Sequence, residues 1–138
     1  MQAWITAVIS RINSTDLAGV MGAVPAVYLD SAAESTVLPL VVITAGQSVV
    51  EHDLAMNQYI RAQADVTVYA SQLSAAEAGA RAIAGALDGA NFAVQGAELL
   101  SNRLAASPAG AVAVVNSEGV PIYKVGLRIA AILFVSGA

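Results

Sequence analysis

The sequence predicts an α+β fold: a mostly antiparallel sheet with an N-terminal helix and one central helix packed on it. Three patterns predict it. Apolar residues with a helical repeat open the chain, a run with strict period-two alternation lies near the middle, and a helical period returns directly after that run. The order of helix, strands, helix and strands is typical of an α+β sandwich. With 138 residues there is room for one core, so we expect residues 1–138 to form a single domain.

The first helix is expected over residues 3–12, because Trp4, Val8 and Ile12 recur on one helical face. Ser14, Thr15 and Asp16 follow it with turn chemistry. A strand is then expected over residues 24–29.

A second strand is expected over residues 38–45, and its almost wholly apolar sequence predicts that both of its faces are covered. Residues 47–58 form the most polar stretch of the chain, and we interpret them as a long connection between two strands. The next strand, over residues 60–70, alternates apolar and polar side chains. This alternation predicts an antiparallel strand with one exposed face.

Ser74 and Glu77 have the spacing of a capping box, with Leu73 as its staple residue, at the start of a helix over residues 75–87. Asp88 and Gly89 end that helix.

The remaining elements are all expected to be extended. Residues 92–94 and 99–105 are weaker strand candidates, and two loops bracket a short extended piece over 111–115. A long strand is expected over 122–135, doubly buried from Ile129 onward.

Composition points to a protein that hides surface against other subunits. Only 12% of the residues are charged while 57% are hydrophobic, and the exposed apolar patches of soluble monomers are usually small. The net charge is −4 and the six cations are scattered singly, so no nucleic-acid footprint is visible. Ser35–Val50 is too short, and too often interrupted, for a membrane helix. Nothing resembles a secretory signal, and we expect a soluble, unprocessed chain.

Chemistry-bearing motifs are almost missing from the sequence. It contains no cysteine and one histidine, His52, which has no second histidine or cysteine to complete a typical metal site. No serine lies in a nucleophile elbow, and the glycines form no phosphate-binding loop. We therefore expect no enzymatic activity, no catalytic or metal-binding residue and no cofactor.

The polar face of the alternating strand, with Arg61, Asp65, Thr67 and Tyr69, has two interpretations. It is either an ordinary solvated sheet face or a subunit interface, where Arg and Tyr are enriched.

Several segments together resemble a known family. They are Val27-Tyr-Leu-Asp30, the apolar strand Leu38-Pro-Leu-Val-Val-Ile43, the strand from Tyr59 to Tyr69, and the Ala-rich helix that closes with Ala86-Leu-Asp-Gly89. This layout resembles the tail terminator (tail completion) proteins of long-tailed bacteriophages and of gene transfer agents. The resemblance is clearest over residues 24–89. From residue 90 onward the sequence departs from it, because residues 105–115 are unusually apolar where family members often carry a charged hairpin.

The resemblance implies a structural virion protein, assembled in the bacterial host cytoplasm. Subunits of this family close into a hexameric ring on the head-proximal end of the tail tube. The ring stops polymerisation of the tube and offers a head–tail joining surface to the head connector or stopper protein. The expected partners are therefore other copies of the chain, the tail tube protein and the connector. DNA would pass through the lumen without specific binding, and no membrane is involved.

By this resemblance, interface roles are expected in three regions. Arg61, Asp65 and Tyr69, together with Arg128, would contact a neighbouring subunit. The loop Glu51, His52 and Asp53 would meet the tail tube or the connector, and residues 108–119 would form an arm or hairpin.

Two alternatives stay open at the level of sequence. One is another neck or tail-tube subunit, which would form open-ended filaments rather than discrete rings. The other is a small oligomeric ligand-binding α+β domain, which would retain a ligand on purification.

Overall fold

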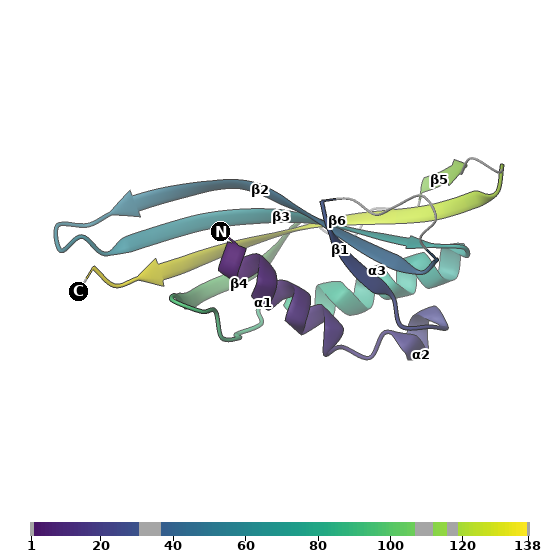
Figure 1. Cartoon of the computed structure of the whole chain (residues 1–138), viewed down its shortest axis with the longest axis horizontal. Coiled ribbons are helices and arrows are strands. Elements are labelled where there is room, and N and C mark those ends of the chain that lie inside the picture. The colour runs from purple at the N-terminus through teal and green to yellow at the C-terminus, as the bar shows by residue number, and fades with distance from the viewer. Residues whose placement is uncertain (1, 31–36, 107–111, 116–118, 138) are drawn as a thin grey trace.

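One six-stranded mixed sheet with helices on a single face forms the protein (Figure 1). The computed structural model describes residues 2–30, 37–106, 112–115 and 119–137. The helices and strands follow in this order along the chain: α1 (Gln2–Asn13), α2 (Ala18–Met21), β1 (Ala26–Leu29), β2 (Leu40–His52), β3 (Gln58–Ala70), α3 (Leu73–Leu87), β4 (Glu98–Ala106), β5 (Val112–Val115) and β6 (Pro121–Val135). The α+β class, the N-terminal helix and the central helix on the sheet are as the sequence predicted.

The strand order is β1-β2-β3-β6-β4, and β5 adds to β6 beyond the end of β4. Every pairing is antiparallel except the one between β1 and β2. Strands β3 and β6 form the centre of the sheet, and their pairing runs from Gln58 opposite Val135 to Ala70 opposite Tyr123.

The core lies between the helices and one face of the sheet. Strand β3 contributes its apolar alternate residues, and β6 does the same with Val125, Leu127, Ile129, Ala131 and Leu133. Helix α1 buries Trp4, Val8 and Ile12, and α3 buries a line of small residues that ends in Ile83 and Leu87. Because that line begins with alanines, α3 lies close to the sheet.

A buried polar group joins three of these elements. The Asn102 side chain on β4 is 1% exposed. It accepts a hydrogen bond from the indole Nε1 of Trp4 at 3.0 Å and donates one to the carbonyl oxygen of Leu87 at 2.7 Å. Since a buried polar group without a partner is costly, these two bonds fix how α1, the end of α3 and β4 meet.

Four expectations about local structure are wrong. Residues 47–58 are not a long connection, because β2 continues to His52 and only a tight turn separates it from β3. β6 is not doubly buried after Ile129, since Ala130, Ile132 and Phe134 on its other face are only half-buried. β2 is not covered on both faces either: Val42 is half-buried, and the residues from Thr44 onward are exposed.

The predicted capping box is the fourth error. Helix α3 begins at Leu73 after Gln72, and no side chain caps its first turn. The strand candidate at residues 92–94 amounts to one isolated bridge between Val94 and Ala97, and the short helix α2 was not predicted. The segment 108–119, which was expected to form an arm or hairpin of its own, lies mostly outside the described residues, apart from β5 and Gly119.

Candidate functional site: an uncovered sheet face, an arm and a groove

The sheet face opposite the helices carries the polar half of β3 and its partners on β2 and β6. Asp65 stands directly opposite Arg128 in the register, and Arg128 Nε donates to Asp65 Oδ1 at 2.8 Å. This hydrogen bond raises the pKa of the Arg128 guanidinium. Both side chains are about half exposed. The pair therefore places two opposite charges on a face that no described helix covers (Figure 1).

A second, looser ion pair lies on the same face. Arg61 Nε is 3.8 Å from Glu51 Oε1, across the β2–β3 pairing, and both side chains are well exposed. An exposed pair of this length contributes little to stability. Tyr69 lies at the other end of β3, half-buried, opposite Leu40 and Lys124. The structure thus brings together Arg61 with Glu51 and Asp65 with Arg128, while Tyr69 stands apart from both pairs.

His52 and Asp53 lie at the tip of a projecting hairpin. We call residues Gln47–Gln58 the arm; Figure 1 shows it extending past the N-terminus of α1 at one end of the molecule. A bulge between Ala45 and Ser48 introduces it. All of the β2 residues in the arm are exposed, and no described strand pairs with the outer edge of β2 at residues 49–52.

The turn at the tip is held by one carboxylate. Asp53 Oδ1 accepts hydrogen bonds from the backbone amides of Ala55 at 2.9 Å and Asn57 at 3.0 Å, and Asp53 Oδ2 accepts one from the Asn57 side chain at 3.0 Å. The bond from the Asn57 side chain is the main cause that lowers the pKa of Asp53. Asp53 therefore organises the turn and keeps its negative charge there.

The C-terminal segment supports the same turn. The amide of Gly137 donates to Asn57 Oδ1 at 2.9 Å. A Cβ at Gly137 would lie 2.6 Å from the carbonyl oxygen of Met56, so only glycine permits this approach. Met56 itself is held at φ 64, a conformation that bulky residues rarely adopt.

This rigid turn presents apolar side chains to solvent. Leu54 is fully exposed and Met56 is 63% exposed, with Val49 and Val50 about half exposed behind them. Leu54 and Met56 were not among the predicted site residues, because the polar residues around them suggested a solvated loop. The signal was present: two large apolar residues within a five-residue turn have no local side chain to pack against.

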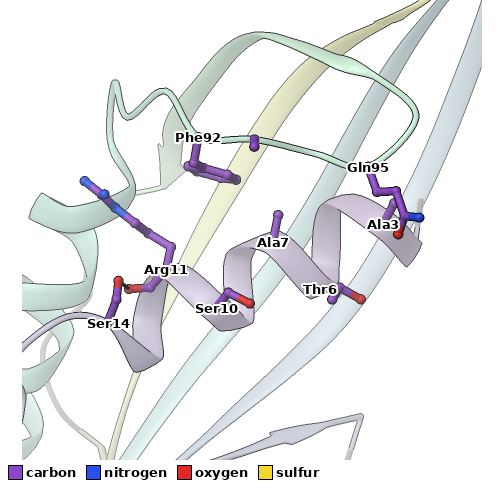
Figure 2. A pocket seen from close by; sticks show the side chains of 9 residues that line it. Ala3, Thr6, Ala7, Ser10, Arg11, Ser14, Phe92 and Gln95 are labelled. Carbon is purple, nitrogen blue, oxygen red and sulfur yellow. Dashed lines mark hydrogen bonds between the residues drawn. The ribbon is translucent and has the colours of Figure 1, made fainter.

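A groove on the helix side is the other candidate site (Figure 2). It lies between α1 and the segment 92–95 and has a volume of about 500 Å³. Its lining consists of Ala3, Thr6, Ala7, Ser10, Arg11, Ser14, Phe92, Ala93 and Gln95. Figure 2 shows Phe92 facing α1 across the groove above Ala7 and Arg11. Arg11 is tied to the body through a hydrogen bond from its Nε to the carbonyl oxygen of Ala86 at 3.1 Å.

A metal-binding cluster is not found in the described part of the chain. Those residues hold no group of three or more His, Cys, Asp or Glu side chains that could bind a metal ion, and His52 is exposed at the end of β2. Among the described helices, none combines the length and apolar character needed to cross a membrane.

The described part of the chain thus leaves one sheet face uncovered by helices and exposes apolar side chains on the arm. Comparison with known proteins identifies the class. The family model for tail completion protein gp17 matches residues 6–114. The chain belongs to this family, and it is a structural protein of the phage tail rather than an enzyme.

A solved structure shares the fold. A chain in the virion of a native gene transfer agent particle superposes with a TM-score of 0.65 at 19% sequence identity, and the match covers 94% of this chain and 92% of that one. No curated protein matches the sequence.

Proposed function

We propose that copies of this chain close into a hexameric ring on the head-proximal end of the tail tube, where the ring stops polymerisation of the tube and provides the head–tail joining surface. The observation that carries the proposal is the pair of unlike exposed surfaces, the uncovered sheet face and the arm, on a member of the tail completion family. A contact between two unlike surfaces of identical subunits is heterologous. Such contacts end in a ring when the rotation closes, and a closed ring caps a growing tube.

The uncovered face supplies the first proposed contact. Arg61, Asp65, Tyr69 and Arg128 would lie against a neighbouring subunit, where desolvation would strengthen charge pairs that contribute little in water. The net charge of −4 suits a ring around a DNA channel, since an acidic lumen does not grip passing phosphates. The tail tube protein and the head connector are the proposed partners at the two ends of the ring.

Adding this chain to polymerising tail tube protein tests the capping role. Tubes should stop growing with a ring visible at one end by electron microscopy, and their length distribution should narrow. If tube length does not depend on the added chain, the capping role is wrong.

A charge reversal tests the sheet-face contact. Arg61→Glu should reduce ring formation, because it places a second negative charge beside Glu51. Arg81→Glu is the matched control, since Arg81 lies on the exposed surface of α3, where it pairs with Glu77. Rings that form equally well from the Arg61→Glu chain would exclude this contact.

A tail-tube subunit is the second candidate, because the outer edge of β2 at residues 49–52 has no described partner strand and open edges also suit filaments. Electron microscopy of the purified chain separates the two, since a tube subunit gives open-ended filaments and a terminator gives discrete rings.

A further inference from the structure

We propose that the arm tip of one copy docks in the groove between α1 and residues 92–95 of a neighbouring copy, with Leu54 and Met56 as the inserted side chains. This inference rests on the proposed ring. It also assigns the arm to a second copy of the chain, in place of the tail tube or connector that the resemblance implied.

The shape of the tip is the first argument. Leu54 is fully exposed and Met56 is 63% exposed, yet the turn that carries them is fixed by three hydrogen bonds to Asp53 and by the approach of Gly137. A flexible apolar loop would lose conformational freedom on binding, which weakens association. Here that cost is already met in the free chain, as in other preorganised binding elements. A rigid turn with two outward apolar side chains therefore has the form of an anchor for a pocket.

The groove is the matching surface. It is an open surface groove with a volume of about 500 Å³ rather than an enclosed pocket. Ala3, Ala7 and Ala93 leave it open, and Phe92 provides an aromatic wall (Figure 2). Ala3 and Ala7 thus present small side chains of α1 to an incoming leucine or methionine. No residue of the chain's own arm lines the groove, and Figure 1 places the arm tip beyond α1.

Charge supports a second copy as the occupant. Among the described residues that line the groove, Arg11 carries a positive charge and none carries a carboxylate. The arm carries Glu51 and Asp53 beside the apolar tip. Docking would bring these carboxylates toward Arg11, so that opposite charges meet at the rim of an apolar contact. Tip and groove are different surfaces of one chain, which makes the contact heterologous and suited to ring closure.

Disulfide trapping tests the contact directly, because the chain contains no cysteine. The double variant Leu54→Cys with Ala7→Cys, oxidised under mild conditions with tail tube protein present, should give a ladder of covalently linked multimers. The matched control pairs Leu54→Cys with Arg81→Cys, which lies on the exposed surface of α3. It should give no ladder.

Association measurements supply a second readout. Leu54→Asp and the groove-filling Ala7→Trp should each weaken self-association by about tenfold or more, as expected for a central anchor, while Leu54→Met should preserve it. Sedimentation over a range of concentrations measures these changes, and the unfolding midpoint of each variant confirms that it is folded.

The outcomes separate this inference from the proposed function. Rings seen by electron microscopy without a link between positions 54 and 7 would overturn the docking contact and leave the capping ring in place. Tubes that are capped by folded Leu54→Asp as well as by the parent chain would overturn it too. If the chain forms no multimers and caps no tubes, both proposals fail.

Discussion

Large apolar side chains are buried in the helix-covered body of the protein and exposed in the arm. In the body, Trp4, Ile83 and Leu87 are completely buried, and Asn102 satisfies the buried polar groups around them. In the arm, Leu54 and Met56 are exposed on a turn that is nonetheless rigid. Burial of apolar side chains in the body is what stability of the fold requires. The arm departs from this, because exposed apolar side chains add nothing to the stability of an isolated chain.

The two outer edges of the sheet also differ, because one is covered and the other is not. At the β4 edge, the end of α3 satisfies the strand: Gly89 N donates to the Asn102 carbonyl oxygen at 2.7 Å, and Asp88 accepts from the Leu104 amide at 2.9 Å. At the β2 edge, residues 49–52 have no such cover among the described residues. Open edges are usually protected against association, so an unprotected one beside an apolar tip supports the proposed role of the arm in assembly.

The largest expected effect is the difference in stability between one truncation in the body and one in the arm. Ile83→Ala should lower the free energy of unfolding by about 2–5 kcal/mol, because it leaves a cavity in the core. Leu54→Ala should change it by less than about 0.5 kcal/mol, since the side chain has no contacts to lose. Urea unfolding of both variants measures the difference. A comparable loss from Leu54→Ala would remove the distinction between body and arm.

A somewhat smaller effect is expected at the buried asparagine. Asn102→Ala should cost about 2–3 kcal/mol, because it leaves the Trp4 indole N–H and the Leu87 carbonyl without partners. Asn91→Ala, at an exposed position, is the control and should be nearly neutral. Thermal unfolding of the two variants checks the prediction, and equal midpoints would show that the Asn102 bonds do not hold the body together.

Smaller still is the effect at the support of the arm tip. Gly137→Ala should push the C-terminal segment away from Met56 and loosen the turn without affecting the core. Amide hydrogen exchange at Ala55 and Asn57 should become faster, while global stability stays within about 0.5 kcal/mol of the parent. Unchanged exchange at both amides would mean that Gly137 does not support the tip.

The smallest effect concerns pH. The pKa of Asp53 is lowered from its ordinary value of 3.8, so its carboxylate stabilises the folded turn above that pH. That contribution is lost as the pH falls through the lower pKa of the folded state. The amide resonances of Ala55 and Asn57 should therefore stay constant down to about pH 4 and shift only below it. In Asp53→Asn this titration should vanish, and a transition near neutral pH in the parent would contradict the assignment.

The helices and strands of the body could be predicted from the sequence, and most of the arm could not, for a physical reason. Periodicity reports burial, and it predicted α1, β3 and α3 because each of them buries one face. Beyond Thr44, β2 buries neither face. Residues 47–52 therefore show no alternation of apolar and polar side chains, and their sequence is typical of a loop. The capping box failed because Ser74 lies inside α3 rather than ahead of it.

The candidate site was foreseen in part for the same reason. Alternation placed Arg61, Asp65 and Tyr69 on one exposed strand face, and β3 presents them there. No local pattern could show that Asp65 faces Arg128, since that contact depends on the β3–β6 register. The groove joins α1 to residues 92–95, two segments far apart in the sequence, and only the folded chain brings them together.

In the proposed ring, the arm contributes to assembly and not to the stability of the single chain. The most direct test measures the length distribution of tail tubes polymerised with the Leu54→Asp chain, alongside the unfolding midpoint of that variant. We expect an unchanged midpoint together with tubes that grow past the length set by the parent chain. A folded Leu54→Asp chain that caps tubes at the parental length would contradict it.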